Sequence, residues 1–96
     1  MFLNSIAHYL PSLVITNEHF LDKNGLTDEW IYTRTGIKAR RRATPGENTS
    51  TMALEAVKKL MEVNKYPINE VDLIVGASYS PYDTVATMAH YVQANC

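Results

Sequence analysis

The sequence predicts an α/β fold that is incomplete within its 96 residues. The first observation is a long amphipathic helix pattern that starts at Asn48 or Thr49. The second is a nearly continuous apolar run of strand length at residues 71–77, which follows that helix. Parallel strands covered by helices on both faces have this pattern, whereas half-exposed strands alternate. A helix followed by such a strand is typical of α/β proteins.

Residues 2–10 form the first predicted element, a short apolar strand that ends before a proline. Thr16 or Asn17 can cap the helix predicted at residues 18–24, because a short side-chain oxygen accepts an otherwise unpaired amide hydrogen bond. Gly25 then supplies a left-handed stop. A strand followed by a short helix is therefore expected.

A second short helix is predicted between Thr27, another cap residue, and Gly36, another stop. Its first turn carries Asp28 and Glu29, where the positive end of the helix dipole favours carboxylates. Residues 37–43 then form an extended, exposed basic segment that leads to a Thr-Pro-Gly turn.

The long helix places apolar side chains on one face and charged ones on the other. Pro67 and Asn69 interrupt the pattern before the buried strand at residues 71–77. A polar and aromatic loop at residues 79–83 follows that strand, at the sheet edge where α/β proteins tend to place ligands. A last helix is predicted at residues 87–95. The apolar positions of the long helix are Met52, Ala53, Ala56, Val57, Leu60 and Met61.

Two strands cannot form a stable parallel sheet alone, because a sheet needs three or more strands and a covered face. We therefore expect the 96 residues to be a piece of a larger fold, or to depend on self-association.

Composition excludes several classes of protein. With 46% hydrophobic residues and a formal charge of −1, the chain is expected to fold, and it shows no global attraction to nucleic acid or anionic membrane. It contains no signal-peptide pattern and no apolar run of the roughly 18 residues that span a bilayer. Its single cysteine, Cys96, cannot form an intramolecular disulfide. We expect a cytoplasmic protein that binds neither nucleic acid nor membrane.

No catalytic residue is predicted within the chain. Cys96 and His90 are six residues apart, about 600° of helical rotation, so they point to different sides of the last helix. The three histidines lack metal-ligand spacing, and we expect no metal. Phosphate-binding glycine loops and the hydrolase nucleophile elbow are also absent from the sequence.

One local charge cluster stands out beside the only tryptophan, Trp30. An exposed indole can stack on a nucleotide base while neighbouring guanidinium groups hold its phosphates. The alternative is a solvated charge run beside a core tryptophan, which composition alone favours. The five basic residues of the cluster are Arg34, Lys38, Arg40, Arg41 and Arg42.

The residues around Trp30 resemble the DEWI-x-TRTGI-x-x-R signature of β-ketoacyl-acyl-carrier-protein synthase III, a family of thiolase-fold condensing enzymes. Residues 28–37 read DEWIYTRTGI, and Arg40 completes the signature. Supporting matches are YLP at residues 9–11, STMA at 50–53 and VDLIV at 71–75. The resemblance implies the amino-terminal portion of the first half of a thiolase-like αβαβα fold over residues 1–96, with no complete second domain.

The resemblance implies a decarboxylative Claisen condensation that joins an acyl-CoA starter to malonyl-acyl carrier protein in fatty acid chain initiation. In the family, Trp30 and Arg34 correspond to residues that hold the adenine of coenzyme A. The basic residues Lys38 and Arg40 to Arg42 are expected to bind phosphate or the acidic carrier protein. Coenzyme A thioester is then a substrate, no cofactor is permanently bound, and a homodimer is expected.

The family's catalytic cysteine, histidine and asparagine lie further along the protein than Cys96, so the resemblance predicts that these 96 residues alone are inactive. Val85 and Ala86 stand where better-known members carry an aromatic residue and a proline that shape the partner's acyl pocket. A longer or branched starter is therefore a hypothesis. Related polyketide or aryl-lipid enzymes and a non-catalytic carrier-protein-binding module remain alternative interpretations.

Overall fold

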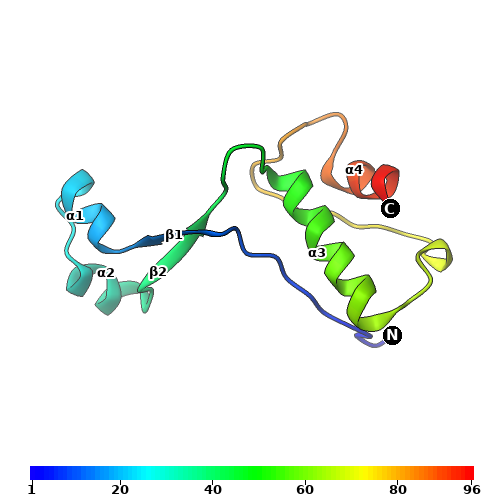
Figure 1. Ribbon diagram of the computed structural model, residues 1–96, viewed down its shortest axis with the longest axis horizontal. Helices are drawn as coiled ribbons and strands as arrows, with labels where there is room; N and C mark the ends of the chain where they lie inside the picture. The colour runs from blue at the N-terminus through cyan, green and yellow to red at the C-terminus, as the bar shows by residue number, and fades with distance from the viewer. The chain divides into compact units, whose positions relative to one another are not determined.

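The computed structural model describes all 96 residues, which divide into two compact units. We call Pro11–Pro45 the hairpin unit, and Met1–Leu10 together with Gly46–Cys96 the helical unit. The hairpin unit contains β1 (Leu13–Thr16), α1 (Glu18–Asn24), α2 (Asp28–Thr35) and β2 (Ala39–Arg42). The helical unit contains α3 (Thr49–Asn64), the short 3-10 helix η1 (Ile68–Glu70) and α4 (Met88–Asn95) (Figure 1).

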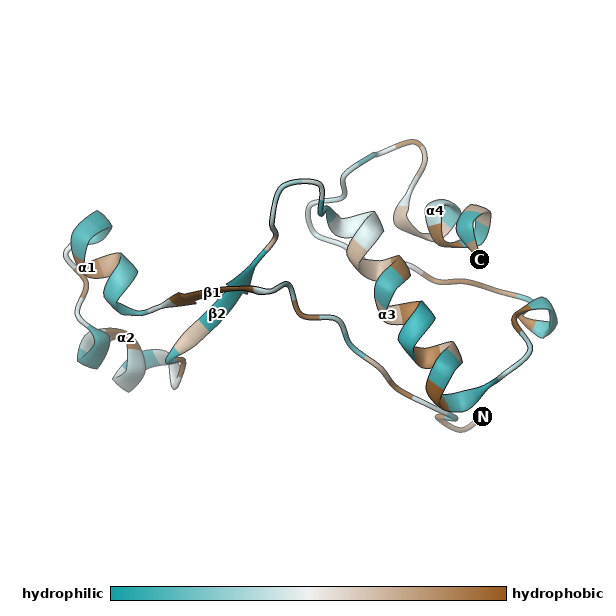
Figure 2. Ribbon diagram, viewed as in Figure 1, coloured by the Kyte–Doolittle hydropathy of each residue, from teal (hydrophilic) through white to brown (hydrophobic).

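In the hairpin unit, β1 and β2 pair in antiparallel register, with Leu13 opposite Arg42 and Thr16 opposite Ala39. The two short helices occupy the chain between these strands (Figure 1). Figure 2 shows that β1 is apolar whereas most of β2 is hydrophilic. The predicted basic segment at residues 37–43 therefore does run extended and largely exposed, as one strand of a two-stranded sheet.

The predicted helix boundaries are confirmed in this unit. Helix α1 covers residues 18–24, and Gly25 stops it in the left-handed conformation with φ of 69°. The Thr27 hydroxyl caps α2 by accepting a hydrogen bond from the Trp30 amide, and Gly36 ends that helix with φ of 70°. These signals act within one helical turn, which makes them readable from sequence.

The strand predicted at residues 2–10 is wrong. The first strand is β1, which starts at Leu13, and no other segment pairs with residues 2–10. An apolar run becomes a strand only when a neighbouring backbone accepts its ladder of hydrogen bonds. Residues 39–42 provide that ladder to β1.

The helical unit is built on the contact between α3 and α4. Helix α3 starts with a capping box, in which the Asn48 side chain accepts from the Ser50 and Thr51 amides while the Asn48 amide donates to the Thr51 hydroxyl. Leu54 of α3 and Val92 of α4 are buried, with 7% and 5% of their surface exposed. The predicted long helix and the predicted last helix are both confirmed, the latter from residue 88.

The buried strand predicted at residues 71–77 is wrong: the segment is extended backbone that pairs with nothing and is exposed, with Leu73 at 77% and Val75 at 82%. A buried parallel strand needs a neighbour at its edge and a layer on each face. The chain supplies one close approach, at Gly76, where an added Cβ would lie 3.2 Å from Met88 Cε. The apolar sequence of a core strand is therefore present without the layers that would cover it.

Candidate functional site

The candidate site is the exposed surface of α2 that carries Trp30 and Arg34. They are four positions apart in the chain, so one helical turn brings both side chains to the same side. The guanidinium carbon of Arg34 lies 4.3 Å from the centroid of the Trp30 ring, and its Nη1 donates to the Trp30 carbonyl at 3.4 Å. The structure thus brings together the two residues that the sequence analysis paired.

Trp30 does not belong to the core of the hairpin unit, because 43% of its surface is exposed. The buried apolar residue of α2 is its neighbour Ile31. An exposed indole with a cation held against its ring offers a stacking surface and hydrogen-bond donors at one place. This combination suits a ligand with a flat aromatic ring and negative charge nearby.

A second cation-aromatic contact lies on the same unit. The Lys38 ammonium is 5.3 Å from the centroid of the Tyr32 ring. Arg42, at the end of β2, is exposed. Lys38 and Arg42 therefore present charge to the solvent, as the sequence analysis expects of the basic segment.

Arg40 and Arg41 are instead engaged within the hairpin unit. Arg40 donates to the Ile15 carbonyl at 3.2 Å and to Asn17 Oδ1 at 2.7 Å, and its guanidinium lies 4.7 Å from the Phe20 ring centroid. Arg41 donates to the Pro11 carbonyl at 2.8 Å. Of the basic residues on β2, only Arg40 is half-buried; Arg41 is exposed although it also donates to a backbone carbonyl of the unit.

Sequence reasoning missed the part that Asn17 plays beside this site. The sequence makes it a candidate cap of α1, but its side chain makes no cap hydrogen bond. It is fully buried and hydrogen-bonds Asp28, the Ile37 carbonyl and Arg40. No spacing rule could have revealed this, because the partners are 11 to 23 residues away in the chain.

Val85 lies in the loop before α4, with 85% of its surface exposed. Its amide and that of Ala86 donate to the Asp83 carboxylate at 2.8 and 3.1 Å, which gives the loop a defined turn. The loop belongs to the helical unit, whereas the Trp30 site belongs to the hairpin unit.

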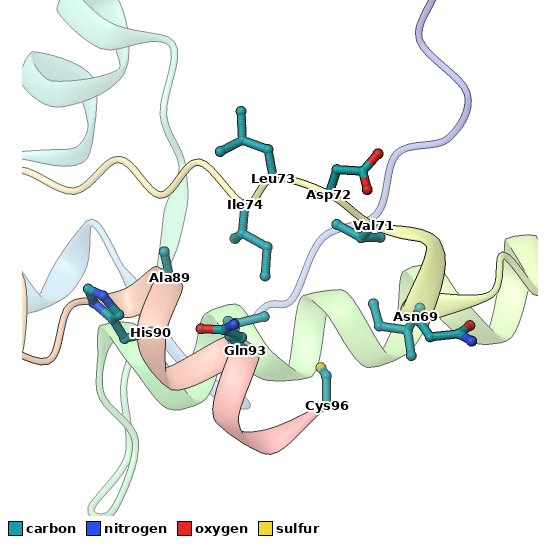
Figure 3. Close-up of a pocket in the computed structure, with 11 residues that line it drawn as sticks. Asn69, Val71, Asp72, Leu73, Ile74, Ala89, His90, Gln93 and Cys96 are labelled. Atoms are coloured by element: carbon teal, nitrogen blue, oxygen red, sulfur yellow. The ribbon is translucent and has the colours of Figure 1, made fainter.

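His90 and Cys96 line a cavity of about 440 Å³ between residues 68–74 and α4 (Figure 3). In Figure 3, His90 lies near the start of α4 and Cys96 just after its last residue. His90 Nδ1 is hydrogen-bonded to the Thr87 hydroxyl at 2.8 Å rather than to the thiol. No group of three or more potential metal ligands is present, and no helix has the length and apolarity to cross a membrane.

The pKa of the Tyr9 phenol is raised above its ordinary value. Its hydroxyl donates to the Glu47 carboxylate, which raises the pKa of the phenol above 10.0. Desolvation and the negative charges of Glu47 and Glu55 act in the same direction. The contact joins the first ten residues to the segment before α3, so its effect is on the structure of the helical unit.

Comparison with curated proteins finds β-ketoacyl-acyl-carrier-protein synthases III. The chain is 37% identical over 92 residues to that of Streptococcus suis, which covers 96% of the chain and 28% of the relative. It is 40% identical over 93 residues to that of Hyphomonas neptunium, which covers 97% of the chain and 29% of the relative. No model of a known protein family matches the chain.

Solved structures agree. The chain superposes on β-ketoacyl-acyl-carrier-protein synthase III from Thermus thermophilus with a TM-score of 0.92 and 36% identity, over 99% of this chain and 30% of that one. The priming β-ketosynthase of the R1128 polyketide pathway matches with a TM-score of 0.72 and 30% identity, over 97% of this chain and 29% of that one.

These likenesses define the class first: the chain is an incomplete α/β piece of a thiolase-like protein. Within that class, it belongs to the β-ketoacyl-acyl-carrier-protein synthase III family. The chain spans about 28% of the length of the curated relatives it matches. The resemblance that rested on residues 28–37 is thereby confirmed at the level of family and fold.

Proposed function

We propose that these residues are the amino-terminal portion of the first thiolase-like half of a synthase III. The whole protein would join an acyl-CoA starter to malonyl-acyl carrier protein, with loss of carbon dioxide, to begin a fatty acid. The family relationship supports the class of reaction. The observation in this chain that carries the proposal is the exposed Trp30–Arg34 pair on α2.

In this proposal, α2 contributes to binding the starter thioester and does not take part in bond formation. The Trp30 ring stacks against the adenine of coenzyme A, and the Arg34 guanidinium covers the ring system and donates hydrogen bonds. Coenzyme A thioester is consumed as a substrate, and no permanently bound cofactor is required. Because one turn of α2 fixes both side chains, little conformational freedom is lost when the adenine binds.

Outward-facing basic residues extend this surface. We assign Lys38 and Arg42 to the phosphates of coenzyme A or to the acidic surface of the carrier protein. Arg40 and Arg41 add positive charge to the same surface, although their guanidinium groups already donate to partners within the hairpin unit. Substitution of Arg40 or Arg41 would therefore disturb the fold of the hairpin unit as well as lower the positive charge of this surface.

Coenzyme A binding can be measured directly because Trp30 is the only tryptophan. We expect coenzyme A to quench its fluorescence, and we expect Arg34→Ala to weaken binding about 10- to 100-fold, since one charge-assisted hydrogen bond contributes about 1.5 to 3 kcal/mol. Lys23→Ala, which removes one positive charge from α1 of the same unit, is the matched control and should change affinity little. Equal losses of affinity in the two variants would mean that coenzyme A binds through nonspecific charge attraction and not at the Trp30–Arg34 site.

The condensation itself is tested on the native gene. We expect its reading frame to continue beyond Cys96 and to encode a catalytic cysteine, histidine and asparagine, and the full-length product to condense acyl-CoA with malonyl-acyl carrier protein. The 96 residues alone should show no turnover. A frame that stops at Cys96 would instead favour the non-catalytic carrier-protein-binding module.

A polyketide-priming function is the second candidate, favoured by the likeness to the R1128 priming β-ketosynthase. Val85 is relevant because a small side chain in this loop would leave room for a longer or branched starter. A panel of acyl-CoA starters on the full-length product separates the two functions: strong preference for acetyl-CoA would exclude the larger starter.

Location and assembly complete the proposal. We also propose that the protein is cytoplasmic. We expect a homodimer, as the family resemblance implies, and size-exclusion chromatography of the full-length product tests this.

A further inference from the structure

Asn17 is the most buried polar residue of the chain, with 0% of its surface exposed. It lies in the chain between β1 and α1, and its side-chain hydrogen bonds go to residues other than Trp30 and Arg34. A buried amide is costly unless its donors and acceptor all find partners. The partners that it has therefore indicate what the residue does.

Its two amide hydrogens go to the two ends of α2. Nδ2 donates to the Asp28 carboxylate at 2.7 Å, at the first residue of the helix, and to the Ile37 carbonyl at 2.8 Å, just beyond the glycine that ends it. One planar group thus holds the start and the finish of the segment that carries Trp30 and Arg34.

Its amide oxygen faces β2. Arg40 Nη2 donates to Oδ1 at 2.7 Å while Nη1 of the same guanidinium reaches the Ile15 carbonyl of β1 at 3.2 Å. The Asn17 backbone amide also donates to the Lys38 carbonyl at 3.2 Å. The orientation of the side-chain amide is unambiguous, because arginine offers only donors and the other two partners offer only acceptors.

We propose that Asn17 is the positioning residue of the Trp30–Arg34 site, clamping both ends of α2 onto the β1–β2 hairpin through one side-chain amide. It does not touch the ligand. It acts by fixing the helix whose single turn aligns the indole and the guanidinium. The inference depends on the proposed function for the nature of the ligand alone, because the clamp is a property of the unliganded hairpin unit.

Asn17→Asp tests the clamp with almost no change in size. The new carboxylate still accepts from Arg40, but it faces the Asp28 carboxylate and the Ile37 carbonyl, which cannot donate to it. Asp28→Asn alone keeps an oxygen that accepts from Asn17 and should behave like the wild type. When the two substitutions are combined, the new amide at position 28 donates to the new carboxylate at position 17. The hydrogen bond between the two positions is then restored with donor and acceptor exchanged, and the net charge is that of the wild type.

Two readouts are taken on the full 96-residue chain, at a temperature where circular dichroism shows intact helices. Iodide quenching of Trp30 fluorescence, without ligand, reports whether α2 is held; titration with coenzyme A reports binding. We expect Asn17→Asp to raise quenching and to weaken coenzyme A binding about ten-fold, because the contacts to Asp28 and Ile37 are both lost while both of these residues are open to solvent. The double variant should recover a large part of both, because only the contact to the Ile37 carbonyl stays broken.

Asn48→Ala is the matched control, because it removes an asparagine that caps α3 in the helical unit. It should lower the stability of that unit without changing Trp30 quenching. The inference is overturned if Asn17→Asp leaves quenching unchanged, if the double variant is as impaired as Asn17→Asp, or if Asn48→Ala impairs the site equally. If quenching rises in Asn17→Asp and recovers in the double variant while the wild type binds no coenzyme A, the inference stands and the proposed function fails. If the wild type binds coenzyme A but quenching is the same in all variants, the proposed function stands and the inference fails.

Discussion

The two units are stabilised by different kinds of contact. In the hairpin unit, the most buried side chain is the polar amide of Asn17. Arg40 and Arg41 donate hydrogen bonds to the backbone carbonyls of Ile15 in β1 and of Pro11 just before it. In the helical unit, apolar contacts join α3 to α4, and the extended segment at residues 71–77 lies uncovered. The hydrogen bonds described for the hairpin unit join residues of that same 35-residue segment. The apolar segment at residues 71–77, by contrast, lacks in this chain the neighbouring strands and helices that would cover it.

This difference indicates which part of the chain carries an organised site. Directional hydrogen bonds define one geometry when every donor and acceptor is satisfied, and no buried side-chain polar atom here lacks a partner. Apolar packing specifies structure only when it is complete on all sides. We therefore expect the Trp30 surface to be ordered by its own unit, and the surface around residues 71–77 to depend on further contacts.

The largest expected effect is that of Leu54→Ala in α3. Truncation of this buried leucine should cost about 2 to 5 kcal/mol of the free energy of unfolding, because a cavity remains between α3 and α4. Urea denaturation followed by circular dichroism measures the loss. Val63→Ala, at an exposed position of the same helix, is the control and should change little. Trp30 fluorescence should report the hairpin unit as unaffected; a coincident loss would mean that the units unfold together.

Asn17→Ala comes next and should act on the other unit. It leaves the Asp28 carboxylate, the Ile37 carbonyl and the Arg40 guanidinium without their shared partner. Because Asp28 and Ile37 are exposed, water can replace part of these contacts, and we expect a total cost of about 1 to 3 kcal/mol. We expect Trp30 fluorescence to show earlier unfolding in urea while the helical signal of α3 persists. Loss of both signals at one urea concentration would contradict the division into separately stabilised units.

Thr27→Ala should have a smaller effect within the hairpin unit. It removes the hydroxyl that accepts from the Trp30 amide at the start of α2, and such caps contribute about 1 kcal/mol. Thr27→Ser keeps the hydroxyl and is the control. Hydrogen exchange at the first amides of α2 measures the fraying, and equal exchange in the two variants would show that Asp28 and Asn17 hold the helix start without the cap.

Tyr9→Phe is the smallest predicted effect on stability, and it disappears at alkaline pH. Because the folded-state pKa of Tyr9 is raised, the stabilisation from its hydrogen bond to Glu47 is complete below the unfolded value of about 10 and is lost as the pH rises through the folded value. Urea denaturation should show Tyr9→Phe to be less stable than the wild type at pH 7, with the difference shrinking as the pH rises through the folded-state pKa of Tyr9. Tyr79→Phe, at an exposed tyrosine of the same unit, is the control and should change stability little at either pH.

Secondary structure was predictable where its signals are local. The stops at Gly25 and Gly36 and the start of α3 after Asn48 depend on residues within a turn of the boundary, and all three agree with the structure. Both strand predictions failed, at residues 2–10 and 71–77, because a strand depends on a partner that local sequence does not reveal.

For the site, the sequence by itself determined the spacing of Trp30 and Arg34, and with it their meeting on one helical turn. The DEWIYTRTGI signature likewise sufficed to identify the family. Only the tertiary structure decided which basic residues also donate to partners within the hairpin unit. It likewise decided that the buried Asn17 side chain bonds Asp28, Ile37 and Arg40 instead of capping α1. The physical reason is distance along the chain: a helical turn joins residues four apart, whereas Asn17 meets Arg40 only after the fold has brought together residues 23 positions apart.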